Sequence, residues 1–378
     1  MEKKKLLFVY YKLYKPGGIN RVLVNLTNEL IEDYDITILV LMSEHKPFYE
    51  LDHRVKLVFI DSFSHWAFSK VNVSIDKYLR WLPKRNNIKN YFYDYGAYKV
   101  SLKWLKENYK NFDRIVTCQY KLSAGVSMHK EIAEKTIAWE HNPHDAGGGI
   151  WGRIRKKYYH NLSFVVATNK AGERFFKSYE AKSEAIYNIM NEAIVNNEFI
   201  ASEKKENFIS LIVRLVDEKN AIGFLEIIKG LNFPNDWKVM ILGDGPLRGK
   251  LEKFIIENNL SEKVKLLGSG TIEDVYDLMK RSKIIALTST NEALPTVLIE
   301  AMFFSNVLIA YDCKYGPADI VNEKNGYLIP LHKKELFQEK LQYLVDNSNE
   351  LDGLMKSSFE EAKNWKKEKR IQQWKEIL

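Results

Sequence analysis

The segment KIIALTSTNEALPTVLIEAMFFSNVLIAY, residues 283–311, decides the fold class of this chain. It starts with a short aliphatic run, passes through a polar loop and ends in a long apolar stretch at 294–311. Pro295, Glu300 and Asn306 interrupt that stretch, and a carboxylate at the centre of a membrane span is costly. We therefore predict a buried strand, a buried helix and a second buried strand, which together form the repeating unit of a parallel sheet.

The same alternation of short aliphatic runs and longer helical patterns extends through nearly the whole chain of 378 residues. It predicts two Rossmann-like domains, because the chain is too long for one compact α/β domain. Hydrophobic periodicity lapses once, at 191–206, where we place a linker. We expect strands at 6–11, 36–42, 55–60, 114–119, 136–141 and 164–169, and then at 208–215, 238–243, 263–268, 284–289 and 306–311.

The linker gives the domain limits, with a first domain at 1–190, a second domain at 207–362 and a C-terminal helix at 363–378. Apolar residues make up 46% of the chain and charged residues 28%, which is typical of a globular protein and excludes a disordered one. Its two cysteines, Cys118 and Cys313, lie far apart in apolar runs. Neither a disulfide framework nor a cysteine-rich metal site is expected.

The start of the chain has no signal-peptide cleavage pattern, so we expect a cytoplasmic protein without a spanning segment. Its net charge of +8 is uneven, because residues 1–185 hold 31 basic against 20 acidic residues and the remainder holds 26 against 29. An insertion at 61–110 has twelve aromatic and ten basic residues but four acidic ones. Helices with an aromatic and a cationic side suit anionic lipid headgroups or a polyanionic acceptor. The alternative is that the aromatics pack on the first domain and the lysines are solvated.

Parallel sheets bind ligands at the carboxyl ends of their strands. Arg214 closes one expected strand, and Lys219 follows at the next helix start. Cations are unfavourable at a helix start, so this pair favours a diphosphate site over a chance pair of surface charges. In KPGGINR (15–21), Gly17 and Gly18 precede a helix and allow an anion to approach, although a plain turn explains them equally well.

The loop and helix start in STNEALPTVLIEA, 289–301, are the strongest candidate site. Pro295 stands where a first helical residue belongs, and the helix start near Thr296 can bind phosphate. Glu292 and Glu300 then remain as carboxylates that can accept hydrogen bonds from sugar hydroxyls. A carboxylate in an otherwise apolar helix favours a site, because it has no structural explanation unless it is paired.

The strand ending TIAWEHN places Glu140, His141 and Asn142 at a carboxyl end of the first sheet. His141 could bond a sugar hydroxyl or stabilise developing charge, and a purely structural histidine is the equal alternative. His144 and Asp145 follow, but no HExxH or cysteine pairing supports a metal site. The chain has neither a GxGxxG fingerprint nor a P-loop, which argues against nicotinamide redox chemistry and P-loop hydrolysis.

Several of these motifs occur together in one known family. GGINR, RLVDEKN, GDGP (243–246), the Glu292 and Glu300 pair, and YGPADIV with NGYLIP (315–330) resemble the family-four retaining glycosyltransferases of bacterial cell-surface polysaccharide synthesis. The resemblance implies the α/β GT-B fold, in which an acceptor-side and a donor-binding domain face a cleft. It also implies that the last helix crosses back to the first domain, anchored by Trp365 and Trp374.

The resemblance further implies a role for each matching residue. Four residues form the implied catalytic set: Arg214 and Lys219 neutralise the donor diphosphate, while Glu292 and His141 bind the sugar. In the implied donor-binding set, the carboxylate binds the ribose hydroxyls and the glycines allow the phosphate to approach closely. Its members are Gly18, Gly243, Gly268, Leu294, Pro295, Thr296 and Glu300.

The activity that the resemblance implies is transfer of a hexose, with retention, from a UDP-linked donor to a lipid-linked or polysaccharide acceptor. Capsule, exopolysaccharide, lipopolysaccharide and teichoic acid are the products that such enzymes build. We expect no metal and no cofactor, because cations and helix dipoles replace a metal in this fold. We also expect peripheral contact with the inner face of an anionic membrane and no nucleic acid partner. The alternatives are an epimerase or phosphorylase on the same fold and a non-catalytic basic binding protein.

Overall fold

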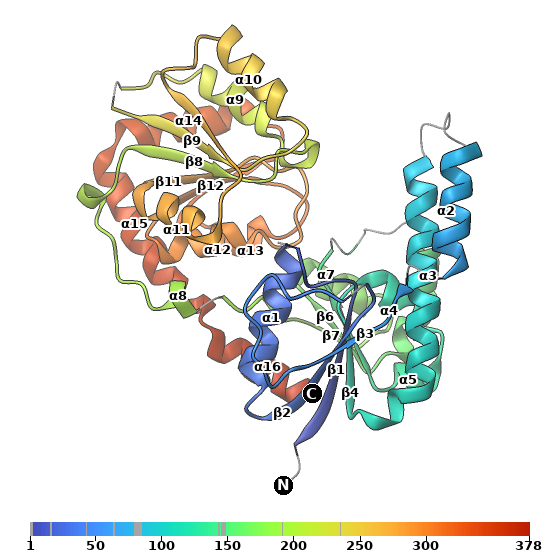
Figure 1. Ribbon diagram of the computed structural model, residues 1–378. Coiled ribbons are helices and arrows are strands. Elements are labelled where there is room, and N and C mark those ends of the chain that lie inside the picture. Colours follow the sequence, from blue (N-terminus) through green and yellow to red (C-terminus); the bar gives the residue numbers. More distant parts are fainter. Residues whose placement is uncertain are drawn as a thin grey trace. The chain divides into compact units, whose positions relative to one another are not determined.

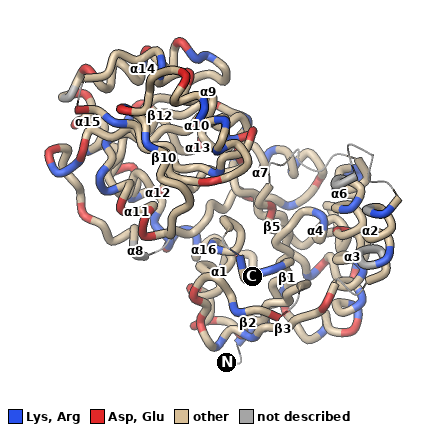
Figure 2. Tube along the Cα trace, turned by 45° about the horizontal axis from the view of Figure 1, so that its top comes forward, with Lys and Arg blue, Asp and Glu red and all other residues tan. Residues whose placement is uncertain are grey.

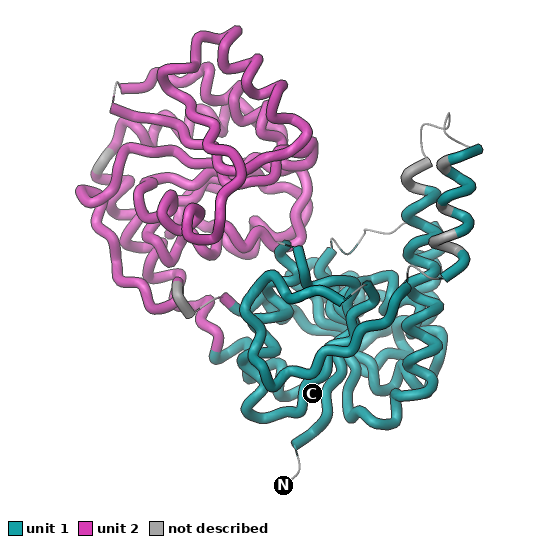
Figure 3. Tube along the Cα trace, viewed as in Figure 1, with its two compact units in different colours: residues 1–189, 368–378 teal, residues 190–367 magenta. Residues whose placement is uncertain are grey.

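The computed structural model describes residues 3–15, 17–42, 44–62, 65–78, 85–142, 144, 149–190, 192–234 and 236–378. The chain forms two compact units, each built on a parallel sheet with helices on both faces (Figures 1 and 3). Unit 1 comprises Met1–Ile189 and Glu368–Leu378, and unit 2 comprises Met190–Lys367. The predicted fold class of two parallel-sheet domains is confirmed.

The sheet of unit 1 has its strands in the order β3-β2-β1-β4-β5-β6-β7, all parallel. In the inner strand β1, Leu6 and Phe8 belong to the core on one face, and Leu7 and Val9 belong to the core on the other. A strand that is buried on both faces reads as a continuous apolar run, which explains LLFV here. The strands are β1 Lys4–Tyr10, β2 Tyr34–Val40, β3 Lys56–Phe59, β4 Arg114–Thr117, β5 Thr136–Glu140, β6 Phe164–Ala167 and β7 Ser183–Ala185.

Helices cover both faces of this sheet. The α1 and α16 side chains pack in the core that contains Leu6 and Phe8, and side chains of α3, α4, α6 and α7 pack in the other. The helices are α1 Gly18–Leu30, α2 Trp66–Tyr78, α3 Arg85–Asn108, α4 Tyr120–Ser127, α5 Lys130–Ala133, α6 Ile150–Tyr158, α7 Lys170–Lys177 and α16 Lys367–Ile377.

The sheet of unit 2 has the order β10-β9-β8-β11-β12-β13, again parallel. In both units the first strand of the unit lies inside the sheet, and the chain winds outward from it in two directions. The carboxyl ends on either side of that strand therefore form a topological switch point, which is the usual ligand position. The strands are β8 Phe208–Ile212, β9 Lys238–Leu242, β10 Val264–Gly268, β11 Ile284–Leu287, β12 Val307–Asp312 and β13 Gly326–Pro330.

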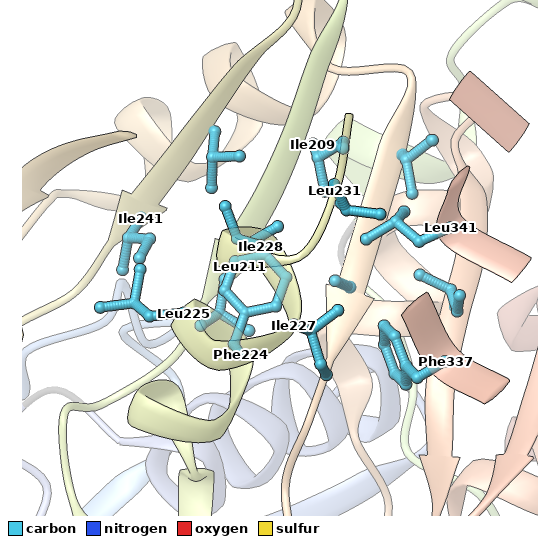
Figure 4. Close-up of a cluster of buried hydrophobic side chains, with 14 of the residues drawn as sticks. Ile209, Leu211, Phe224, Leu225, Ile227, Ile228, Leu231, Ile241, Phe337 and Leu341 are labelled. Atoms are coloured by element: carbon cyan, nitrogen blue, oxygen red, sulfur yellow. The ribbon is translucent and has the colours of Figure 1, made fainter. Parts of the chain in front are cut away.

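The main core of unit 2 lies between the sheet and the helices that contribute Phe224, Ile228, Phe337 and Leu341 (Figure 4). A smaller cluster that contains Leu278 occupies the opposite face. The helices are α8 Glu192–Val195, α9 Ala221–Lys229, α10 Arg248–Glu257, α11 Ile272–Arg281, α12 Thr296–Phe303, α13 Pro317–Ile320, α14 Lys334–Asp346 and α15 Ser348–Ala362.

Two edge strands were not predicted, namely β7 and β13. The first has three residues, and the second starts at Gly326 with φ +154° and ends at Pro330, so neither shows a continuous β-branched run. The apolar stretch 294–311 forms α12 and then β12, as predicted. Among the described residues, no helix has both the length and the apolar character needed to cross a membrane.

The predicted linker at 191–206 differs from the structure, in which its described residues pack on unit 2. Ile194 on α8 is 1% exposed, α8 contacts α12, and the Ile200 amide donates to Ser305 Oγ at 3.0 Å. The polar composition of this segment concealed those few buried contacts. The C-terminal segment that returns to unit 1 begins at Glu368 rather than 363, so Trp365 belongs to unit 2 and Trp374 to unit 1.

The insertion predicted at 61–110 contains α2 and α3, which pack against each other as a helical hairpin that projects from unit 1 (Figure 1). The hairpin is attached through α3, where Ala97, Tyr98, Leu102 and Leu105 enter the core. Its connection at 79–84 lies outside the described residues. Part of the aromatic content is therefore core, as the alternative interpretation expected, and part is exposed.

Candidate active site

The carboxyl edge of the unit 2 sheet brings together two residues that the sequence analysis selected separately. Lys219 ends a short 3-10 helix, Asp217–Lys219, before α9, and Glu292 lies in the loop between β11 and α12. Lys219 Nζ donates to Glu292 Oε1 at 2.6 Å. The two side chains are 19% and 11% exposed, so this ion pair is largely shielded from water. A charge-assisted bond in such a place holds both side chains at one end of the sheet.

Arg214 lies two residues beyond the end of β8, at the same carboxyl edge. Its side chain is 75% exposed, and the distance from Nη2 to Glu218 Oε1 is 3.9 Å. An exposed pair at that distance is worth little. The guanidinium therefore remains available to an anionic ligand, whereas Lys219 must exchange Glu292 for one.

The loop between β11 and α12 is tied to the loop that carries Lys219. Thr288 Oγ1 donates to the Asn220 carbonyl at 3.2 Å, and the Thr290 amide donates to the Glu218 carbonyl at 2.9 Å. Asn220 has φ +49°, a left-handed conformation that turns the chain from the 3-10 helix into α9. These bonds fix the register of the Lys219 and Glu292 backbones, and the sequence analysis did not identify the two threonines.

The α12 helix starts directly after this loop. Pro295 is its N-cap and the helix begins at Thr296, so Pro295 lies one residue earlier than predicted. Leu294, immediately before it, is 9% exposed. The positive end of the α12 dipole therefore lies a few residues from Glu292, where it favours negative charge. Glu300 lies within the same helix and is 3% exposed, the burial expected for a carboxylate that serves a specific partner.

Gly243 and Gly268 follow β9 and end β10, and they are joined by an amide-to-carbonyl bond of 2.7 Å. Gly243 has φ +142°, and a Cβ atom there would lie 1.8 Å from the Val213 carbonyl oxygen. No other residue fits without moving the backbone that leads into Arg214. Gly268 has φ +82°, so its conformation also favours glycine. Both glycines therefore shape the edge that presents Arg214.

A third loop reaches the same edge and was not assigned to the site by residue. Gly316 has φ +75°, and a Cβ atom there would lie 2.6 Å from the Ala293 carbonyl oxygen and 2.8 Å from Pro295 Cδ. The motif YGPADIV that contains it contributed to the family resemblance. A glycine before proline was the available signal, because that pattern often marks a close backbone approach.

In unit 1, His141 follows the last residue of β5. Its ring packs on Trp139, with centroids 4.3 Å apart, and its Nε2 is enclosed without a hydrogen-bond partner among the described residues. Burial lowers the pKa of His141 to about 3, so the imidazole is neutral at physiological pH. A neutral ring can exchange a hydrogen bond with a sugar hydroxyl but offers no positive charge.

Gly18 is the first residue of α1, and Gly17 is its N-cap. A Cβ atom at Gly18 would meet nothing within 4 Å. The neighbouring protein atoms therefore do not require a glycine here. Close approach of a phosphate to Gly18 stays a prediction. The conformation of Gly17, with φ 168°, is extended and not specific to glycine.

Glu140 corrects one expectation about the first sheet. It was grouped with His141 as a ligand-facing residue, but it is 2% exposed and forms an internal network. Arg155 Nη2 donates to its Oε2 at 3.4 Å, and the Tyr159 hydroxyl donates to its Oε1. Burial raises the pKa of Glu140, while Arg155 and Tyr159 oppose that rise. Adjacent residues at the end of a strand point to opposite faces, which separates Glu140 from His141.

The described residues contain no group of three or more His, Cys, Asp or Glu side chains placed to hold a metal ion. Asp145, considered in the sequence analysis, lies outside the described residues. Cationic groups and a helix start are therefore the features of the unit 2 edge that can bind an anion. They can hold a nucleotide diphosphate, while Glu292 and Glu300 can accept hydrogen bonds from hydroxyl groups.

Comparison with known proteins agrees with this chemistry. Residues 195–371 match the family described as Glycosyl transferases group 1. The chain is 26% identical over 380 residues to a protein of Campylobacter jejuni, with 99% of this chain and 98% of the relative covered. That relative is named GalNAc-alpha-(1->4)-GalNAc-alpha-(1->3)-diNAcBac-PP-undecaprenol alpha-1,4-N-acetyl-D-galactosaminyltransferase.

Two solved structures share the fold across the whole chain. A TarM variant of Staphylococcus aureus, in a complex that includes UDP, has a TM-score of 0.73 at 17% identity and covers 99% of both chains. HepE of Anabaena in complex with UDP has a TM-score of 0.72 at 16% identity and covers 98% of both chains. At such identities the likeness concerns the fold.

Proposed function

We propose that this chain is a group 1 glycosyl transferase of the GT-B fold and that it moves a hexose from a UDP-linked donor to a lipid-linked or polysaccharide acceptor. The product would be a cell-surface glycan. The name of the Campylobacter relative, which specifies a glycan on undecaprenyl diphosphate, supports such an acceptor. The UDP complexes of the two similar structures support the choice of nucleotide.

The observation that carries the proposal is the Lys219 and Glu292 ion pair beside the start of α12. A diphosphate bound there would receive Lys219, the exposed Arg214 and the positive end of the helix dipole. Glu292 would then be released from Lys219 and could accept a bond from a sugar hydroxyl. Glu300 would hold the ribose diol.

We propose that transfer retains the configuration at the anomeric carbon. The bond from that carbon to the β-phosphate oxygen breaks, and the acceptor oxygen forms its bond on the same face. The acceptor proton passes to the departing phosphate oxygen, which leaves UDP as the second product. Lys219 and Arg214 stabilise the charge that grows on the phosphate.

Metal independence is part of the same proposal. Lys219, Arg214 and the α12 dipole supply positive charge at the place where a divalent cation would otherwise sit. The chain should therefore transfer sugar in the presence of a chelator. A strict requirement for added Mg²⁺ or Mn²⁺ would contradict this part of the proposal.

The first test is a thermal-shift and product screen of the purified chain with UDP-, GDP- and dTDP-sugars. A ligand that binds the folded chain raises its melting temperature. We expect the largest shift with a UDP-sugar and transfer only when a glycan acceptor is added. Epimerised donor without acceptor, or turnover that needs free phosphate, would instead indicate an epimerase or a phosphorylase.

Lys219→Ala tests the residues of the site. Loss of this cation should lower kcat/KM by about 100-fold or more, because a buried group that stabilises developing charge contributes that much. Lys229→Ala is the matched control, since Lys229 is exposed at the end of α9, the helix that follows Lys219. Equal activity of the Lys219 variant and the control, with both folded, would refute the assigned site.

A further inference from the structure

The helical hairpin of unit 1 exposes an aromatic and basic stripe. On α2, Trp66, Lys70, Val73 and Lys77 are separated by four, three and four residues, which places them on one side of the helix. Tyr78 adjoins the stripe. Trp66, Val73 and Tyr78 are 55%, 67% and 66% exposed, so they are not part of the protein core.

Exposed apolar side chains are concentrated in this hairpin. Among the described residues, ten large hydrophobic side chains are exposed, and four of them lie between Trp66 and Tyr91. Scattered single exposures are normal on a protein surface, but a cluster of large ones marks a contact surface. The opposite side of α2 is different, since Ile75 is 5% exposed and faces the protein.

Among the described side chains of the hairpin, the exposed charge is mostly positive. On α3 and just beyond it, Lys99, Lys103, Lys106 and Lys110 follow the same spacing and are exposed. With the two lysines of α2, six lysines and one glutamate, Glu107, are exposed among the described side chains of residues 65–110. The lysine positions in the described part of α3 are blue in Figure 2. The acidic residue Asp94 is buried and bonded to Lys121, so it does not offset this charge.

The combination identifies the kind of partner. A soluble polyanion would pair with the lysines but would leave Trp66, Val73 and Tyr78 in water. A bilayer that contains anionic phospholipid satisfies both sets, because Trp and Tyr rings lie at headgroup level and lysine stems extend to the phosphates. We propose that the α2 and α3 hairpin is the surface by which unit 1 binds an anionic membrane. The inference rests on the proposed function in that this contact would bring the enzyme to a lipid-linked acceptor.

The test is sedimentation of the full chain with phosphatidylcholine vesicles that either contain or lack phosphatidylglycerol. Wild type should bind mainly the anionic vesicles. Lys70→Glu combined with Lys77→Glu should weaken that binding by about tenfold or more, since each lysine near an anionic surface contributes. Lys250→Glu with Lys253→Glu, which makes the same charge change on exposed residues of α10, should bind as wild type.

The aromatic part of the surface has its own test. Trp66→Ser with Tyr78→Ser should weaken vesicle binding, whereas Ile256→Ser with Tyr343→Ser should not. The control residues are 69% and 43% exposed in unit 2, so they remove comparable apolar surface from another place. Loss of binding in the controls, or wild-type binding by the hairpin variants, would overturn the proposal. So would binding of wild type to heparin but not to vesicles.

A transfer assay in detergent with a short acceptor separates this inference from the proposed function. Hairpin variants that transfer normally in detergent but bind vesicles weakly would support a membrane surface distinct from the catalytic site. If wild type binds vesicles through the hairpin and transfers no sugar, the membrane surface stands and the proposed function fails. If wild type transfers sugar but does not bind anionic vesicles, the proposed function stands and the membrane surface fails.

Discussion

Replacement of Trp374 by alanine should detach the C-terminal helix from unit 1 and destabilise that unit alone. Trp374 on α16 is 1% exposed and packs edge-on against Trp139 of β5, with ring centroids 4.9 Å apart. Arg370 is also buried, with its guanidinium 5.0 Å from the centroid of the Tyr187 ring, and Ile371 and Ile377 pack against the core at its edge. Gln373 Nε2 donates to Glu184 Oε1 at 2.6 Å, and Lys375 pairs with Asp33 at 2.6 Å.

The magnitude follows from these contacts. Truncation of a fully buried aromatic residue to alanine costs about 3–5 kcal/mol, because it removes apolar burial and leaves a cavity. Exposed ion pairs such as Lys375 with Asp33 contribute at most about 1 kcal/mol each, so they cannot hold the helix by themselves. We therefore expect Trp374 to make the largest single contribution to the docking energy of α16.

Hydrogen exchange measured by mass spectrometry resolves the two units separately. Loss of 3–5 kcal/mol should accelerate exchange in β1 and β5 by about a hundredfold to a few thousandfold, while β8 and β9 keep their protection. Trp237→Ala is the matched control, because Trp237 is 6% exposed in the core of unit 2. It should produce the opposite pattern.

Two results would refute this reasoning. One is a Trp374 variant in which β1 and β5 exchange as in wild type, which would show that α16 is not held by its buried tryptophan. The other is faster exchange confined to unit 2, which would show that α16 stabilises unit 2 rather than unit 1. A modest loss of activity should accompany the expected result, because Trp139 also packs on His141.

Three further predictions concern buried polar groups and one glycine. Burial lowers the pKa of Lys205 to about 7, against about 10.4 in the unfolded chain. The free energy of unfolding, and with it the melting temperature, should therefore increase as the pH is raised from about 7 to about 10. Lys205→Met should remove most of that increase in melting temperature. Glu140→Gln should cost about 3–5 kcal/mol in urea denaturation because it removes the carboxylate that neutralises the buried Arg155 cation, and Glu140→Gln with Arg155→Met should recover most of that loss. Gly243→Ala should abolish the thermal shift by a UDP-sugar, since its Cβ would displace the Val213 carbonyl; an unchanged shift would contradict the assigned role of this loop.

Much of the architecture was predictable because buried parallel strands have a strong local signature. Runs such as LLFV in β1 and IIAL in β11 are apolar on both faces, and each is followed by a helical pattern. The edge strands β7 and β13 lack that signature, since an edge strand has only one neighbour and needs less apolar surface. The polar composition of the predicted linker at 191–206 likewise concealed its contacts with unit 2, in which Ile194 is 1% and Lys205 is 7% exposed.

Residues of the candidate site differed in how far the sequence could place them. The sequence selected Lys219 and Glu292 from their positions after strands, but it could not pair them. It also selected Glu140 from its position at the carboxyl end of a strand, but that position did not indicate a residue that faces a ligand. The partners of Glu140 are Arg155 in α6 and Tyr159 in the 3-10 helix that follows it, and neither carries a local signal of burial.

By itself, the sequence determined two parallel-sheet units and the candidate donor-site residues at the carboxyl ends of their strands. Those properties follow from local hydrophobic patterns and from the direction of the chain in a parallel sheet. Only the tertiary structure decided that Lys219 meets Glu292 across 73 residues and that Trp374 joins the core of unit 1. Contacts between distant segments depend on the packing of the whole unit, and no local pattern specifies them.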